Sequence, residues 1–320
     1  MPLVNAFSKA VVRDFSLEEL KEAARLMRGY DLVALCAAGS GPASGTLSMM
    51  EIVAALYLKV AMHDPNNPEW SHRDCVIWSA GHKVRALYLG LAFAGYFPIE
   101  DVVTLREPYS PFQGYLHKPK LPGAEVSRGS LGQGLGIAAG LASSGKLDHD
   151  EHTVFCVMDG EQQEGNIWEP AMEASRYKLD NLVAIIDRNR MQTDSRIKGV
   201  RNVEPLEKRY RGFGWEVIEI DGHDVQQVVS ALQKAKGVPV LGKPTVIIAN
   251  TVKGKGVSFM ENVTGWDGKA LDYDEMVAAL DELGLKETIA YDVLLESARE
   301  YELEVAIELA AHSPSVSRDC

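Results

Sequence analysis

The sequence predicts an α/β fold, with a mostly parallel β-sheet, helices on both of its faces, and a helical C-terminal tail. In the second half of the chain, short continuous apolar runs alternate with helical patterns, as is typical of strands buried on both faces. The charged stretch 271–311 keeps a helical pattern, with no loop-rich linker before it. We therefore expect a single domain over residues 1–320, with its core at about 17–269 and the tail at about 271–312.

The chain begins with helical patterns separated by a loop. Apolar residues recur at helical spacings over residues 17–36, and Ser16 with Glu19 forms a capping-box pattern at the start. The small-residue stretch 38–45 must be a loop because it is rich in glycine and serine. A helical pattern resumes over 48–60.

The remaining elements follow from the same two patterns. A short buried strand is predicted at 75–78, and helices are predicted at 84–94 and 135–143, on either side of an irregular stretch rich in proline and tyrosine. We expect further strands at 153–158, 182–186, 217–220 and 245–249, and further helices at 169–177 and 225–235.

Composition excludes several classes of protein. With 46% hydrophobic and 24% charged residues, the 320-residue chain is neither disordered nor collagen-like. The net charge of −12 disfavours non-specific binding to nucleic acid or anionic membranes, and no apolar run approaches the roughly 18 residues that cross a bilayer. The widely spaced cysteines, and an N-terminus without a signal-peptide pattern, favour a cytoplasmic protein with reduced thiols.

Polar side chains follow two of the predicted strands. Asp159 and Gly160 come directly after the run 153–158, and Asn189 follows the run 182–186. Carboxyl ends of parallel strands meet at one edge of a sheet, so these side chains can meet. Together with a backbone carbonyl they offer oxygen ligands suited to Mg²⁺ or Ca²⁺, and Gly160 lets a phosphate approach the backbone. Taken alone, the Asp-Gly pair is more typical of an ordinary turn.

The spacing between these residues is more specific. Asp159 and Asn189 lie thirty residues apart, with Glu-Gly-Asn-Ile-Trp-Glu at 164–169 between them, and this pattern resembles the thiamine-diphosphate (ThDP) signature of transketolases. Other motifs resemble those of the family in the same order: Ser79-Ala80-Gly81-His82, Gly129-Ser130-Leu131-Gly132-Gln133-Gly134, Asp221-Gly222-His223-Asp224 and Lys253-Gly254-Lys255-Gly256. The resemblance covers about residues 17–269 and is to the N-terminal, diphosphate-binding half of the family.

The resemblance implies an activity and a partner. It implies a transferase that uses ThDP and Mg²⁺ (or Ca²⁺) to move a two-carbon ketol unit from a ketose donor to an aldehyde acceptor. In the family, the glutamate that protonates the aminopyrimidine belongs to the pyrimidine-binding domain. We therefore expect an α2β2 assembly with a separately encoded pyrimidine-binding subunit. Two alternatives stay open: the α-subunit of a 2-oxo-acid dehydrogenase, and a non-catalytic ThDP-binding scaffold subunit.

The resemblance also implies roles for individual residues. The implied metal ligands are Asp159, Asn189 and the backbone carbonyl of Met191. The implied cofactor-binding residues are His82, Gly129, Leu131, Gly160, Glu161, Asn189 and Asp267. The implied catalytic residues are His82, Tyr115, His117 and Glu164, the last of which would pair with the partner's glutamate and share a proton with it.

Three positions depart from the family pattern. Pro42, Tyr115 and Asp267 stand where transketolases have histidines that contact the donor sugar. Proline cannot donate a side-chain hydrogen bond, and an aspartate anion can only accept one. We therefore expect cofactor binding to be retained and sugar recognition to be changed, which favours a specialised substrate.

Overall fold

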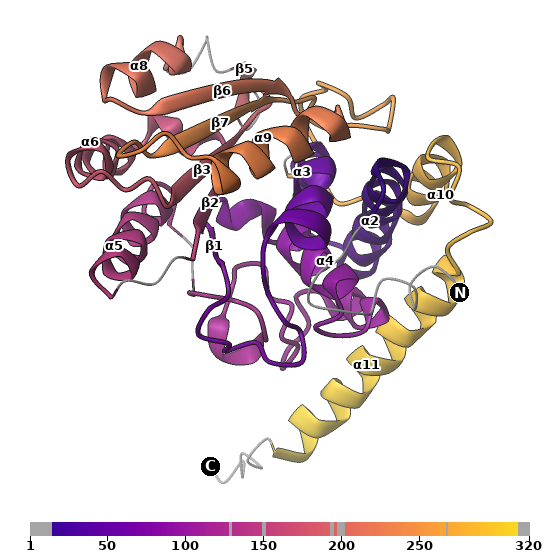
Figure 1. Cartoon of the computed structure of the whole chain (residues 1–320). Coiled ribbons are helices and arrows are strands. Elements are labelled where there is room, and N and C mark those ends of the chain that lie inside the picture. The colour runs from indigo at the N-terminus through magenta and orange to yellow at the C-terminus, as the bar shows by residue number, and fades with distance from the viewer. Residues whose placement is uncertain are drawn as a thin grey trace, which may run out of the picture.

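A five-stranded parallel sheet forms the centre of the molecule (Figure 1). The computed structural model describes residues 15–127, 130–148, 152–192, 195–196, 202–266 and 268–312. In spatial order, the strands are β1 (Cys75–Trp78), β2 (Val154–Met158), β3 (Leu182–Arg188), β7 (Thr245–Asn250) and β6 (Glu216–Asp221). Each neighbouring pair is parallel, which confirms the predicted fold class and all five predicted strands.

Helices cover both faces of this sheet (Figure 1). Their bounds are α2 (Leu17–Ala38), α3 (Met50–Ala55), α4 (Val84–Ala94), α5 (Gly134–Leu147), α6 (Trp168–Arg176), α8 (Leu206–Gly212), α9 (Val225–Gly237), α10 (Tyr273–Glu282) and α11 (Tyr291–His312). The helix predicted at 48–60 is in fact three consecutive turns of different type, because a 3₁₀ turn (Thr46–Met49) precedes α3 and a π-helical turn (Leu56–Val60) follows it.

Alternate residues of each strand face opposite layers. In β2, Phe155 and Val157 pack into a large cluster with residues of α2, α3, α4 and α9. Cys156 and Met158 pack into a second cluster with residues of α5, α6 and α8. Strands buried on both faces need apolar residues at every position, which explains the continuous apolar runs in the sequence.

The N-terminal helix and the C-terminal helices pack together. The capping box at the start of α2 is present, with the Glu19 N–H donating to the Ser16 Oγ at 3.3 Å. Gly29 in α2 leaves room for the tail, because a Cβ there would lie 2.5 Å from Cδ1 of Ile289. The far end of α11 extends away from the body (Figure 1). Among the described residues, no helix has the length and apolar character needed to cross a membrane.

Candidate functional site

The candidate site lies at the carboxyl edge of the sheet. His82 belongs to the short 3₁₀ turn Gly81–Lys83 that follows β1, Asp159 directly follows β2, and Asn189 directly follows β3. These strands are neighbours, so the loops after them meet, as is typical of ligand sites in parallel α/β sheets. The structure thus brings together three residues that lie far apart in the sequence.

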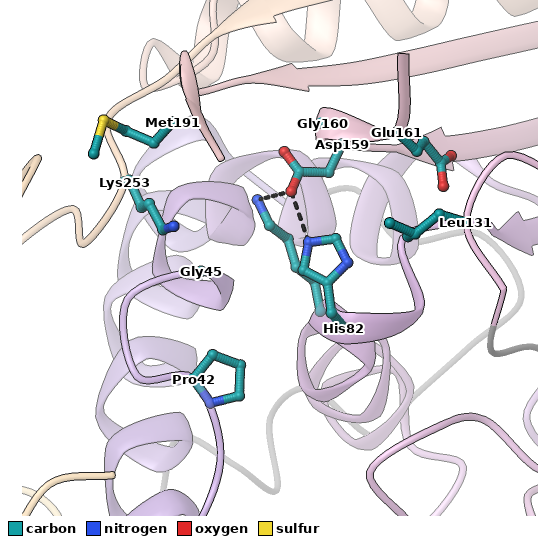
Figure 2. A pocket seen from close by; sticks show the side chains of 10 residues that line it. Pro42, Gly45, His82, Leu131, Asp159, Gly160, Glu161, Met191 and Lys253 are labelled. Carbon is teal, nitrogen blue, oxygen red and sulfur yellow. Dashed lines mark hydrogen bonds and ion pairs between the residues drawn. The ribbon is translucent and has the colours of Figure 1, made fainter. Parts of the chain in front are cut away.

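Asp159 is the centre of this group. Its Oδ2 lies 2.8 Å from Nε2 of His82 (Figure 2) and 3.1 Å from Nζ of Lys83. Its Oδ1 accepts a hydrogen bond of 2.7 Å from Nδ2 of Asn189. Burial alone would raise the pKa of this carboxyl, but the Lys83 charge and the His82 hydrogen bond hold the pKa well below its usual range. Asp159 is therefore an anion at neutral pH.

Lys83 is the residue that the sequence motifs did not single out. Its side chain is only 1% exposed, and its Nζ lies 2.5 Å from Oδ2 of Asp187 as well as 3.1 Å from Asp159. Asp187 is buried at the end of β3 and also accepts hydrogen bonds from the hydroxyls of Ser48 and Thr251. One lysine therefore bridges two buried carboxylates beneath the site.

Asn189 and Met191 supply further oxygen atoms. The Asn189 Oδ1 accepts a hydrogen bond of 3.0 Å from the N–H of Met191. A Cβ placed on Gly160 would lie 4.0 Å from the Met191 carbonyl oxygen, so this oxygen lies beside the Asp159-Gly160 turn. A carboxylate, an amide and a carbonyl thus converge, a set that suits a hard divalent cation once the amide turns its oxygen toward Asp159.

Glu161 has a buried carboxyl group beside the same cavity. Its Oε2 accepts from the N–H of Gly132 at 3.3 Å, and its Oε1 has no hydrogen-bond partner among the described residues. Burial is the main cause that raises the pKa of Glu161 to about 7, against the smaller lowering effects of the nearby Ser79 hydroxyl and the Gly132 N–H. An unpartnered polar atom here fits a site that receives a polar ligand.

A cavity of about 240 Å³ joins these groups. Its lining residues are Pro42, Gly45, His82, Lys83, Leu131, Asp159, Gly160, Glu161, Met191 and Lys253. Figure 2 shows Lys253 and His82 directed toward the space below Asp159, with Pro42 at the opposite end. Two lysines, a histidine and the backbone of two glycines are well suited to an anionic ligand such as a diphosphate.

A second cavity of about 240 Å³ adjoins the first and shares Pro42 and His82 with it. Tyr115 and Arg106 also line this second cavity. The structure therefore places two of the three departures from the family pattern in one cavity. The segment that precedes the third departure also lies close to this loop, because the Ala43 N–H donates a hydrogen bond of 2.9 Å to the Trp266 carbonyl oxygen.

Other expected site residues lie at the rim or beyond the described residues. Glu164 and His117 are exposed, and neither lines the two cavities. Glu164 packs against the glycine-rich turn, because a Cβ on Gly132 would lie 2.7 Å from the Glu164 Cβ. Gly129 and Asp267, expected to bind the cofactor, lie outside the described residues.

The family model for "Transketolase, thiamine diphosphate binding domain" matches residues 19–313. The match extends past residue 269, where we expected the resemblance to end, and it includes both helices of the tail.

Two curated relatives match along nearly their whole length. One is the 6-deoxy-6-sulfo-D-fructose transketolase subunit SqwG of Clostridium sp. (strain MSTE9), which is 40% identical over 266 residues, covering 83% of this chain and 96% of the relative. Another is an apulose-4-phosphate transketolase subunit from Actinobacillus succinogenes, which is 38% identical over 275 residues, covering 84% of this chain and 98% of the relative.

Solved structures give the same result for the fold. The transketolase of Campylobacter jejuni superposes with a TM-score of 0.78 at 31% identity, covering 91% of this chain and 48% of that enzyme. The chain thus spans about half the length of this solved transketolase. The chain belongs to the transketolase family and corresponds to its thiamine-diphosphate-binding, N-terminal domain.

Proposed function

We propose that this chain is the ThDP-binding subunit of a two-component transketolase, which moves a two-carbon ketol unit from a ketose donor to an aldehyde acceptor. The observation that carries the proposal is the convergence of His82, Asp159 and Asn189 at the sheet edge, beside a cavity with two lysines. Relatives of similar length are named as subunits of transketolases, which supports a separately encoded partner.

The residues of the first cavity fit the diphosphate of ThDP. Gly160 has no side chain to block close approach, and Lys83 and Lys253 supply positive charge. The proposed metal, Mg²⁺ or Ca²⁺, would be held by Asp159, Asn189 and the Met191 carbonyl, leaving positions for phosphate oxygens. Oxygen ligands of this kind are those that both cations prefer.

Several side chains would position the cofactor and substrate. When bound, ThDP supplies the carbanion-stabilising chemistry that breaks and forms the C–C bond beside a carbonyl. The contact of Asp159 with Nε2 of His82 holds the imidazole ring at the wall of the first cavity. Glu161 accepts a hydrogen bond from the Gly132 N–H and so fixes the turn after Leu131. We propose that Leu131 and Gly129 lie against the aminopyrimidine.

The rim residues support a partner subunit. Glu164 is an exposed carboxylate beside the glycine-rich turn, available to share a proton with a glutamate of the partner. Leu131 and Ile137 are 37% and 36% exposed, which gives the same region an apolar character. An α2β2 assembly that covers this surface is part of the proposal. A cytoplasmic location is also part of it, supported by the thiols of Cys36, Cys75 and Cys156.

We propose a specialised substrate. Pro42 and Tyr115 line the second cavity in place of the family's histidines, and His117 follows Tyr115 by two residues in the sequence. The relatives named for a sulfosugar and for apulose 4-phosphate support a substrate outside central sugar metabolism.

The test is reconstitution. The purified chain should bind ThDP weakly and transfer no ketol unit by itself, and it should become active when mixed with a separately encoded pyrimidine-domain subunit. Ketol transfer by the chain alone would refute the two-component proposal. ThDP binding without any transfer in the reconstituted complex would favour the scaffold alternative, and decarboxylation of a 2-oxo acid would favour the dehydrogenase alternative.

A further inference from the structure

Lys83 places a permanent positive charge within the proposed diphosphate site. Its side chain lines the first cavity and is 1% exposed, so the ammonium group cannot swing out to water. Its Nζ lies within 3.2 Å of an oxygen of Asp159, Asp187 and Ser48, which accounts for its three N–H donors. The charge is therefore fixed in position beneath the proposed metal ligand.

We infer that Lys83 is a built-in cation of the diphosphate site that takes over part of the charge neutralisation otherwise supplied by a divalent metal. This inference rests on the proposed function, because it requires a diphosphate in this cavity.

The charges around the cavity support this inference. Asp159 and Asp187 are two buried carboxylates at the ends of neighbouring strands, and without a nearby cation they would oppose an incoming diphosphate. The positive charge of Lys83 neutralises one of these two negative charges. Charges act strongly over a few ångströms in a site shielded from water. The neutralisation by Lys83 should therefore strongly favour the binding of a ligand with several negative charges.

A purely structural role would be to neutralise Asp187. That carboxylate already accepts hydrogen bonds from Ser48 and Thr251, and Lys83 completes its set of partners. The contact of Lys83 with Asp159 is not needed for this role. The contact with Asp159 places the ammonium group of Lys83 between Asp187 and the cavity, where the ammonium group also acts on any ligand of Asp159.

The inference has two opposite consequences. Lys83 should strengthen the binding of diphosphate in the absence of metal. It should also weaken the binding of the metal alone, because an ammonium group 3.1 Å from Oδ2 of Asp159 repels a cation held by the same carboxylate. Diphosphate affinity should therefore depend less on metal than it would without Lys83.

The experiment compares pyrophosphate binding with and without metal. The full chain is titrated with inorganic pyrophosphate by calorimetry, in Mg²⁺ and in excess chelator. The variant Lys83→Met/Asp187→Asn removes Lys83 together with one of its two carboxylate partners, while Asp159 keeps its hydrogen bonds with His82 and Asn189. The matched control is Lys236→Met/Asp74→Asn, which removes another lysine–aspartate pair whose residues do not line the first cavity.

The variant keeps the net charge of the site but loses the charge that lines the cavity, because Lys83 lines it and Asp187 does not. We therefore expect it to lose about ten-fold or more in metal-free affinity for pyrophosphate, about 1.4 kcal/mol, and to lose less in Mg²⁺. The control should bind as the unmodified chain does. Equal metal-free affinity in the variant and the unmodified chain would overturn the inference and leave the proposed function intact.

The unmodified chain provides a second test, which does not depend on the folding of any variant. It should retain measurable pyrophosphate binding in chelator. Binding in Mg²⁺ that disappears completely in chelator would overturn the inference alone. Absence of both pyrophosphate and ThDP binding under all conditions would overturn the proposed function, and the inference with it.

Discussion

Arg85 holds the backbone of Pro42 from beneath the second cavity. Its Nη2 donates a hydrogen bond of 2.7 Å to the Pro42 carbonyl oxygen, and its Nε donates one of 2.7 Å to Oδ1 of Asp31. Arg85 and Asp31 are both buried, so this contact is shielded from water. The loop that forms one wall of the cavity is therefore anchored through its main chain, independently of the side chain at position 42.

Substitution of Arg85 should lower the free energy of unfolding, and the loss should be larger when Asp31 keeps its charge. Arg85→Met leaves Asp31 as an unpaired buried carboxylate, so we expect a loss of about 3–5 kcal/mol in the free energy of unfolding. Arg85→Met/Asp31→Asn removes both charges and should lose clearly less. Urea denaturation of the two variants measures the difference, and equal losses would show that the ion pair is not what the substitution disrupts.

Restoring the family's histidines should change the substrate range. Because the main chain at Pro42 is anchored, Pro42→His/Tyr115→His should keep the loop in place and supply donors for substrate oxygens. Loss of one such donor typically costs on the order of 10²-fold in rate. We expect the variant, reconstituted with its partner, to turn over ordinary ketose phosphates at least about ten-fold faster than the unmodified enzyme.

The control for this experiment is Tyr115→Phe, which removes only the hydroxyl of a side chain that is 55% exposed. It should not improve turnover. The prediction fails if the unmodified enzyme already converts ordinary ketose phosphates at roughly a few per second, the range of a typical enzyme.

Asp159→Asn should abolish metal-dependent ThDP binding. The substitution removes the only negatively charged member of the proposed metal-ligand set and leaves Lys83 paired with Asp187, so the fold should survive. Calorimetry should show an affinity for ThDP in Mg²⁺ that is lower by roughly 100-fold or more, comparable to the loss of a strong charged contact. Asp180→Asn, which removes a carboxylate that binds Lys146 outside the cavity, should leave ThDP affinity unchanged.

The buried Glu161 should make the apo protein less stable as the pH rises. Its pKa is raised from 4.5 to about 7, so between these values the folded chain binds a proton that the unfolded chain has lost. Stability then falls as the pH rises from about 4.5 to about 7, by up to about 3 kcal/mol, and becomes level above that. Glu161→Gln should remove this slope, which urea denaturation across the pH range will show.

Glu51 should give the opposite slope and serves as the comparison. Burial alone would raise its pKa, but Arg28 and His223 lower the pKa to about 2. Stability from Glu51 is therefore present above about pH 4.5 and lost as the pH falls toward about 2. A Glu161→Gln variant with the same slope as the unmodified chain between pH 4.5 and 7 would contradict the assignment of that slope to Glu161.

Local patterns predicted the sheet and the centre of the site. Strands such as β2 are buried on both faces, so their sequence is continuously apolar, and Asp159 directly after such a run could be placed at the sheet edge. The short helix α8 was not predicted because its seven residues are mostly charged or polar and show no apolar periodicity. The antiparallel pair of β4 (Met191–Gln192) and β5 (Ser195–Arg196) was missed because two-residue strands leave no pattern.

Tertiary contacts determined what the sequence could not predict. Lys83 is adjacent to His82, and a lysine beside a glycine-rich turn gives no sign that it will be buried. Its partner Asp187 ends an apolar strand, and only strand pairing brings Asp159 and Asp187 together. The position of His117, which is exposed and lines neither cavity, likewise depends on an irregular loop whose path no periodicity defines.

The loops that form the first cavity come from segments spread along the chain, from Gly45 to Lys253, and join only when the sheet is complete. A ligand held there binds the native state alone, so its binding energy opposes every opening that separates those segments. Amide hydrogen exchange should therefore slow across all five strands when ThDP binds, including β6, because even the loop that follows β6 contributes no residue to the lining and feels the ligand only through the sheet. The binding of one small molecule would therefore stabilise the whole sheet against opening.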